Sequence, residues 1–237
     1  MKSKTSISVN QIFFKSITHY AITVIPLLAG VIAVFINPTI FDISGNIGST
    51  VDDQNRLLIE DFLSISKLVL ALMMSFFISY RWVSMEKDGS YGFWLALRVK
   101  REKFVLRTFF MFFVDAFFGI IAGVVIVLIS FGGILSMTKF LILMVLLGIN
   151  IALITIVAIF IGEIIQDPEI STIVFLGIFS LNYFFDNSQS SIFHKITKTD
   201  LHYADSNFIV PMILSIALIV VISLITLVVH NRKGIEI

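Results

Sequence analysis

Long apolar runs alternate with short polar segments along the whole chain. Each run has about 20 residues, the length that an α-helix needs to cross the hydrocarbon core of a bilayer. Strands of a membrane barrel need only about half that length, so the pattern predicts helices. The apolar runs predict six membrane spans, at residues 18–36, 62–83, 104–131, 139–165, 170–185 and 208–230.

The segment "SVNQIFFKSITHY" precedes the first span and has one apolar face. Val9, Phe13, Ile17 and Tyr20 recur at three- and four-residue spacing, with Lys15 off that stripe. This spacing predicts an amphipathic helix at the membrane surface. No small-residue cleavage site follows a short apolar core, so we expect the first run to be retained as a span. Pro26 lies inside that span and is expected to kink it.

Composition places the chain among integral membrane proteins. Of its 237 residues, 57% are hydrophobic and only 14% are charged, and the mean hydropathy is +0.99. A soluble domain would carry about 25% charged residues. The fold class expected is therefore an all-α polytopic membrane protein, with residues 1–237 forming one transmembrane domain. The chain has no cysteine, which excludes disulfides and thiol chemistry.

The distribution of lysine and arginine predicts the orientation, because these residues are enriched in cytoplasmic segments near span ends. Most of the 17 cationic residues fall in the N-terminal segment, the connection between the second and third spans, and the C-terminal tail. The others are Arg56, Lys67, Lys139, Lys195 and Lys198. Both termini are therefore expected in the cytoplasm of a cell-membrane protein.

The connection between the second and third spans, "MEKDGSYGFWLALRVKREKF", combines charge with aromatic residues. Gly89 and Gly92 are expected to end the preceding helix. Phe93, Trp94 and Leu97 then follow at helical spacing with Arg101, which predicts a short helix lying flat at the cytoplasmic face. Two interpretations stay open at this point. The segment is either a positive-inside loop with aromatic anchors or a handle for a soluble partner.

The stretch "MEKDGSYGFWLALRVKREKFVLRTFF" resembles the segment that joins the second and third spans of type 2 ABC exporter permeases. The match includes an acidic residue before Gly-Ser, a run with leucines, and a turn leading through Phe into the next span. The matching residues are Glu86, Gly89, Ser90, Leu95, Leu97, Val99, Arg101 and Phe104, with Arg107 in place of a lysine. The sequence departs from the family where Arg98 replaces a proline and Lys100 replaces a serine.

The resemblance implies a permease that works as a homodimer or heterodimer with a separate ATP-binding subunit, which holds ATP and Mg²⁺. The helix between the second and third spans would be the coupling helix that docks on this subunit. The expected contact residues are Glu86, Gly89, Ser90, Phe93, Trp94, Leu97, Arg101 and Lys103. The chain itself has no Gly-x-x-x-x-Gly-Lys-Ser/Thr phosphate cradle, so ATP hydrolysis is expected in the partner.

Other function classes have weaker sequence support. There is no His-Glu-x-x-His motif and no Gly-x-Ser-x-Gly elbow, so no enzyme activity is expected. His194 and His202, with Asp200 and Asp205, give a metal-site hypothesis that competes with a solvated outer loop. We expect no metal, no cofactor in this chain and no nucleic-acid partner. The alternative function is a non-transporting scaffold or assembly subunit that binds a soluble partner or acidic lipids through its basic inner loop.

Polar residues inside the spans are costly in a membrane and are candidates for function. Asp115, Lys67 and Asn150 lie within predicted spans. Asp115 is either a polar point on a translocation path or dimer interface, with Lys67 as a possible partner, or a structural contact to another helix. Lys67 could instead extend toward the outer surface, and Asn150 favours an interhelical hydrogen bond. The spans are otherwise apolar all round, which favours an apolar or amphipathic cargo or a path formed transiently between two permeases.

Two further patterns concern packing. Gly119 and Gly123 form a small-xxx-small pair that predicts a close helix contact in the third span. Glu163 and Asp167 are expected at the inner end of the fourth span, which Pro168 ends.

Overall fold

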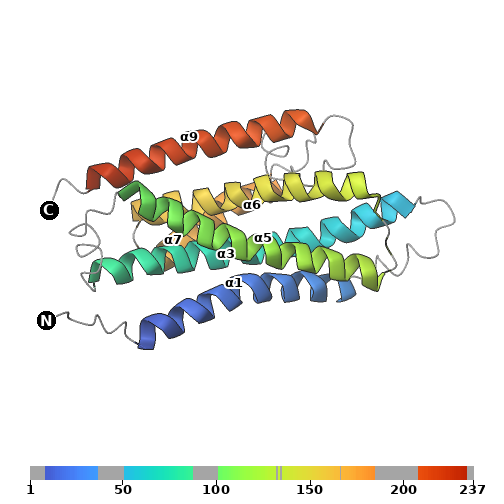
Figure 1. The fold of residues 1–237 in the computed structure, drawn as a ribbon, viewed down its shortest axis with the longest axis horizontal. Coiled ribbons are helices and arrows are strands. Elements are labelled where there is room, and N and C mark those ends of the chain that lie inside the picture. The colour runs from blue at the N-terminus through green and yellow to red at the C-terminus, as the bar shows by residue number, and fades with distance from the viewer. Residues whose placement is uncertain are drawn as a thin grey trace, which may run out of the picture.

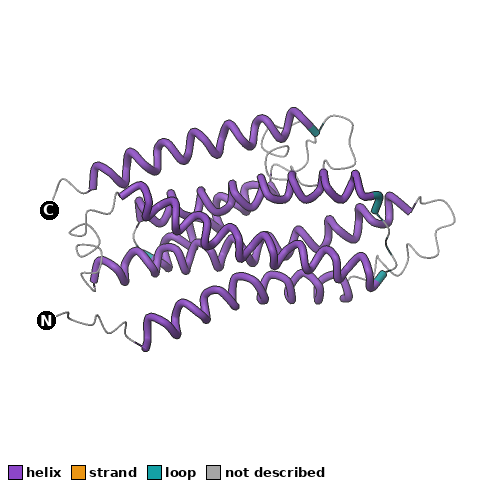
Figure 2. The backbone as a smooth tube through the Cα atoms, in the orientation of Figure 1, coloured by secondary structure: helices purple, strands orange, loops and turns teal. Residues whose placement is uncertain are grey.

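The computed structural model describes residues 9–36, 51–87, 101–131, 133, 135–165, 167–184 and 208–233. Within these residues the chain is all-helical and contains no strand, which confirms the predicted helical class (Figures 1 and 2). The helices are α1 (Val9–Ile36), α3 (Val51–Lys87), α5 (Arg101–Ser130), α6 (Met137–Ile165), α7 (Pro168–Phe184) and α9 (Ile209–Lys233).

The helices run along one long axis and form an elongated bundle (Figure 1). α3 lies at its centre and packs against α1, α5, α6 and α7. α5 packs against α1, α3 and α6, whereas α9 lies mainly on α6. One end of the bundle, on the left in Figure 1, holds the start of α1, the end of α3 and the start of α5. It also holds the end of α6, the start of α7 and the end of α9, and we call it the inner end.

Four helices are long and apolar enough to cross a membrane. Their apolar stretches are Leu57–Arg81 of α3, Val105–Ser130 of α5, Met137–Ile165 of α6 and Ile209–His230 of α9. The apolar part of α1, Tyr20–Ile36, is shorter, and α7 has 17 residues. The protein is therefore a membrane-embedded, multi-pass helical protein, and the count of six spans stays a prediction.

The predicted N-terminal amphipathic helix is not a separate element. Val9–Ile36 forms one continuous helix, so the predicted surface segment is the first part of α1. The physical reason lies in the sequence: no Gly or Pro interrupts residues 9–20, and nothing ends the helix before the apolar stretch. Pro26 lies inside α1, where Ser66 Oγ of α3 donates a 2.9 Å hydrogen bond to its carbonyl oxygen.

Glycines let α1, α3 and α5 approach closely, as the Gly119–Gly123 pair predicted. A Cβ atom added at Gly119 would lie 2.5 Å from the backbone oxygen of Thr23 in α1. A Cβ atom at Gly123 would overlap the ring of Phe62 in α3, and one at Gly30 of α1 would meet the same ring. Phe62 therefore fills a space that two glycines leave open, and it is fully buried.

α6 and α7 are joined by a tight connection at the inner end. α6 ends at Ile165, and Pro168 is the first residue of α7, a position where a missing N–H costs nothing. Asp167 caps α7: its Oδ1 accepts hydrogen bonds from the backbone N–H groups of Glu169 and Ile170, at 2.9 and 3.0 Å. The prediction that the fourth span ends before Pro168 is confirmed.

Candidate functional site

The predicted coupling segment is flanked by the end of α3 and the start of α5, and both lie at the inner end of the bundle. α3 continues as a helix past its apolar stretch, from Arg81 to Lys87, and α5 begins at Arg101, before its apolar stretch starts at Val105. Glu86 is therefore in the last turn of α3 and Arg101 is the first residue of α5. Lys103 is exposed. The other predicted contact residues lie outside the described residues: Gly89, Ser90, Phe93, Trp94 and Leu97.

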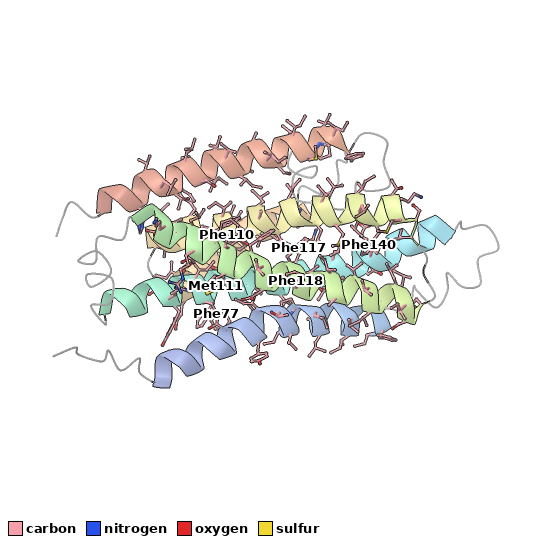
Figure 3. All side chains as sticks on the ribbon, viewed as in Figure 1. Phe77, Phe110, Met111, Phe117, Phe118 and Phe140 are labelled. Atoms are coloured by element: carbon pink, nitrogen blue, oxygen red, sulfur yellow. The ribbon has the colours of Figure 1, made fainter. Side chains whose placement is uncertain are left out.

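Two arginines lie close together at this inner end. Arg81 of α3 donates from Nη1 to the sulfur of Met111 in α5, at 3.3 Å. The guanidinium of Arg107, one turn before Met111, is near enough to repel that of Arg81. Met111 is marked in Figure 3. The inner ends of α3 and α5 therefore carry a concentration of positive charge next to the predicted coupling segment.

Lys67 is buried inside the bundle, with 7% of its surface exposed. Lys67, Met74 and Arg81 follow at seven-residue spacing, which places them on one face of α3. At Met74 this face of α3 points toward α6, because the hydroxyl of Thr155 in α6 lies 3.5 Å from the sulfur of Met74. Lys67 therefore lies buried on the face of α3 that it shares with Met74.

Asp115 is half-buried in α5, on the side that faces α1. Its backbone carbonyl accepts a 3.4 Å hydrogen bond from Thr23 Oγ1. The contacts of Phe62 with Gly123 and of Arg81 with Met111 fix how the antiparallel helices α3 and α5 are aligned. On α1, Thr23 contacts Asp115 and Pro26 contacts Ser66, the neighbour of Lys67, so Asp115 and Lys67 lie within about one turn of helix in level, and their pairing stays a prediction.

Asn150 is buried in α6, with 2% of its surface exposed. It has a polar or ring contact within the structure, as expected for a polar side chain in a membrane helix. One turn further, Thr155 donates to the carbonyl of Ile151 in its own helix at 2.8 Å. Of the three predicted intramembrane polar residues, Lys67 and Asn150 are therefore buried and Asp115 is half-buried.

A cluster of serine hydroxyls that the sequence analysis missed joins α3 and α7. Ser79 donates to Ser171 Oγ at 2.7 Å, and the hydroxyls of Ser75 and Ser171 are 3.2 Å apart. All three residues have no exposed surface. Ser75 and Ser79 are four residues apart on one helix face, which is a weak signal that the sequence did carry. Nothing in the sequence marked Ser171 as their partner.

A buried pair of ionisable residues, also missed, joins α6 and α9. His230 Nδ1 lies 2.8 Å from Glu163 Oε1, and each side chain has 3% of its surface exposed. The sequence analysis expected Glu163 at the inner end of its span but did not pair it with His230. Hydropathy gives the depth of a residue in the membrane, whereas pairing depends on which helices are neighbours.

A shallow apolar groove of about 400 Å³ opens between α5, α6 and α9. It is lined by Phe113 and Phe117 of α5, the stretch from Met144 to Ala152 of α6, and Ile219 of α9. The rings of Phe113 and Phe117 stack with their centroids 5.6 Å apart. Gly148 leaves the space beside Phe117, which is marked in Figure 3. The groove offers its occupant almost no polar atoms, so it suits a hydrocarbon group.

No group of three or more His, Cys, Asp or Glu residues within the described part of the chain could hold a metal ion. His194 and His202, the candidates from the sequence, lie outside that part. No family model, no curated protein and no solved structure matches the chain. The fold and its apolar helices thus define the class, a multi-pass helical membrane protein, and the comparisons add no family.

Proposed function

We propose that the chain is the membrane-spanning permease subunit of an ATP-driven exporter, which works with a separate ATP-binding subunit. The sequence support is the resemblance of residues 85–110 to the coupling segment of type 2 ABC exporter permeases. The structural observation that carries the proposal is the position of the two helix ends that flank this segment. α3 and α5 both extend beyond their apolar stretches at the same end of the bundle, where α1 begins and α9 ends (Figure 1).

The contacts of α3 and α5, the two helices that flank the segment, suit a coupling role. α3 packs against α1, α5, α6 and α7, and α5 also packs against α9. Every other described helix therefore contacts α3 or α5. A soluble partner that moved the connection between α3 and α5 would act on the whole bundle through these contacts. A positive-inside loop with no partner needs no such arrangement.

The proposal includes six spans with both termini in the cytoplasm, and a second permease in the working transporter. α1 and α7 would complete the six crossings. Their apolar stretches of 17 residues are about 26 Å long, a few Å short of the hydrocarbon thickness, which slight thinning of the bilayer accommodates. The inner end, with Arg81, Lys103 and Arg107, would face the cytoplasm, in line with the positive-inside rule.

The cargo in this proposal is apolar or amphipathic. The support is the groove of about 400 Å³ between α5, α6 and α9, whose lining is almost wholly apolar. In addition, many apolar side chains on α5 and α9 are exposed on the bundle surface, so hydrocarbon can reach the groove from the membrane. Purified chain reconstituted alone in vesicles should not conduct ions, and steady conduction would contradict an apolar cargo.

The test is co-purification of the tagged full-length chain in mild detergent, with ATP hydrolysis measured on the recovered complex. Phe93→Ala/Trp94→Ala should abolish recovery of an ATP-binding subunit. The matched control, Phe35→Ala/Phe118→Ala, removes two aromatic rings that are 49% and 65% exposed on α1 and α5, outside residues 85–110, and should retain the subunit; Phe118 is labelled in Figure 3. A folded chain that never recovers an ATPase would overturn the proposal and favour the scaffold alternative.

A further inference from the structure

One face of α5 joins the positively charged inner end of the bundle to the apolar groove. Lys103, Phe110 and Phe117 follow at seven-residue spacing, which places them on that face. Lys103 is exposed, Phe110 is 53% exposed, and Phe117 lines the groove (Figure 3). We propose that this face and the groove bind one anionic phospholipid of the membrane leaflet at the inner end. Its phosphate would contact Lys103 and Arg107, and one acyl chain would lie in the groove.

The depth of the groove matches the reach of such an acyl chain. Lys103 lies before the apolar stretch of α5, which begins at Val105, so it is placed at the level of lipid headgroups. Phe113 and Phe117 follow Arg107 by about 9 and 15 Å along the helix, at 1.5 Å per residue. One leaflet contributes about 15 Å of hydrocarbon, half the thickness of the core. A phosphate beside Arg107 therefore leaves the terminal half of its acyl chain at the level of the groove.

The walls of the groove suit a hydrocarbon chain. The rings of Phe109, Phe113 and Phe117 stack in succession, with centroids 5.7 and 5.6 Å apart, and form a continuous wall along α5. Gly148 of α6 leaves the space beside Phe117, and Ile219 lines the groove from α9. An acyl chain gains little by exchanging other lipid for protein. The groove therefore positions the chain, and the preference for one lipid over another must come from the headgroup.

The charges at the inner end favour an anionic headgroup. Lys103 and Arg107 are four residues apart on α5, and both are exposed. Each such cation near the membrane surface raises the affinity for anionic lipid about fivefold. The guanidiniums of Arg81 and Arg107 repel each other, and an anion beside Arg107 would offset that repulsion. Because Arg107 is exposed, it can contact a phosphate while it keeps its contacts within the protein.

A lipid in this position would also join two helices that have few contacts with each other. α9 packs mainly on α6 and much less on α5, and only 11% of its apolar stretch is buried in the protein. The acyl chain would fill the space between α5 and α9 and extend the packing of both. This inference names the molecule that the groove holds, and it does not need the permease proposal, because lipid binding requires no ATP-binding subunit.

The experiment is native mass spectrometry of the full-length chain in detergent. Phosphatidylglycerol and phosphatidylcholine with the same acyl chains are added at known concentrations. The unmodified chain should retain one phosphatidylglycerol, with an affinity at least about fivefold higher than for phosphatidylcholine. Glycerol phosphate, which has a phosphate but no acyl chain, should not compete. Equal affinity for the two lipids, competition by glycerol phosphate, or a dimer of the chain that excludes lipid would each overturn the site.

Two charge variants test the headgroup contact. Lys103→Gln removes one exposed charge outside the apolar stretch and should lower the affinity for phosphatidylglycerol about fivefold, with no change for phosphatidylcholine. The matched control is Lys139→Gln at the start of α6, the opposite end of the bundle, and it should change neither affinity. Equal losses in the two variants would overturn the headgroup contact.

Two groove variants test the position of the acyl chain. Gly148→Leu fills the groove from α6 and should abolish retention of the lipid. Gly177→Leu on α7 is the control, since nothing lies within 4 Å of a Cβ atom added there, and it should retain the lipid. Ile219→Trp fills the groove from α9 and decides the result if Gly148→Leu fails to fold. Retention of phosphatidylglycerol by a folded groove variant would overturn the site. All these measurements use the chain without an ATP-binding subunit, so their outcome is separate from that of the co-purification test.

Discussion

The two sides of the bundle are held together in different ways. On one side, α1, α3 and α5 approach until backbone and ring atoms fill the space above Gly30, Gly119 and Gly123. On the other side, α9 exposes most of its apolar stretch and meets α6 at its inner end through Glu163 and His230. The first side is held by close packing around glycines, whereas the second adds a polar contact between two ionisable side chains to the packing of α9 on α6. The comparison teaches that neighbouring helices of one membrane bundle can be joined in different ways.

The largest expected effect is on the glycine contacts. Gly119→Leu should destabilise the protein by at least about 3 kcal/mol, because the new side chain must displace the α1 backbone at Thr23. Gly177→Leu is the matched control, since nothing lies within 4 Å of a Cβ atom added there, and it should change stability by less than about 0.5 kcal/mol. Thermal unfolding in detergent, followed by size-exclusion fluorescence, measures both. Equal melting temperatures for the two variants would contradict the conclusion that close packing at Gly119 holds α5 against α1.

A pair of leucines compares the two sides with the same substitution. Leu63 of α3 has no exposed surface, and Leu224 of α9 is 60% exposed. Leu63→Ala should cost about 3 kcal/mol because it leaves a cavity between packed helices. Leu224→Ala should cost less than about 0.5 kcal/mol, because lipid replaces the lost contacts. Reversible unfolding in mixed micelles gives both free energies, and a cost for Leu224→Ala as large as that for Leu63→Ala would remove the distinction.

The serine cluster should contribute less than the apolar packing. Ser171→Ala removes the hydroxyl that Ser75 and Ser79 both contact, and we expect a loss of about 1 kcal/mol. Thr226→Val is the control, because the Thr226 hydroxyl bonds within α9 and links no other helix. The same unfolding measurement applies. A loss for Thr226→Val that matches that for Ser171→Ala would show that the link between α3 and α7 adds nothing.

The smallest effect should have the opposite sign. The hydroxyl of Thr108 in α5 is buried and has no hydrogen-bond partner within the described part of the chain. Thr108→Val keeps the shape and removes this polar atom, so it should stabilise the protein by about 0.5 to 1 kcal/mol. Thr108→Ser, which keeps the hydroxyl and removes the methyl group, should destabilise instead. A lower melting temperature for the valine variant would indicate a partner for this hydroxyl.

The sequence predicted the helices well and their neighbours poorly. The predicted stretches 62–83 and 139–165 lie within α3 and α6. The predicted stretch 104–131 begins three residues after α5 begins and ends one residue after α5 ends. Long apolar runs determine such elements locally. The pairing of Glu163 with His230 and the position of Phe62 between Gly30 and Gly123 depend on contacts between distant segments. Because the helices are apolar on nearly all sides, their sequences carry little information about which face meets which neighbour.

In the candidate site, too, some features could be predicted from the sequence and others could not. The positions of Arg81 near the end of α3 and of Lys103 near the start of α5 could be predicted from the span ends and the cationic residues alone. The alignment of α3 with α5 could not, because it follows from how Phe62 and Met111 pack. A one-turn change in that alignment would leave the hydropathy profile the same.

The length of α3 has a mechanical consequence. Its 37 residues form a rod of about 55 Å, nearly twice the thickness of the hydrocarbon core. A rod that pivots inside the bilayer acts as a lever: a tilt of about 5° around its midpoint moves each tip by about 2 Å. The tip at Lys87 and the tip at Val51 would move in opposite directions. α3 can therefore convert a small displacement on one face of the membrane into a displacement of similar size on the other.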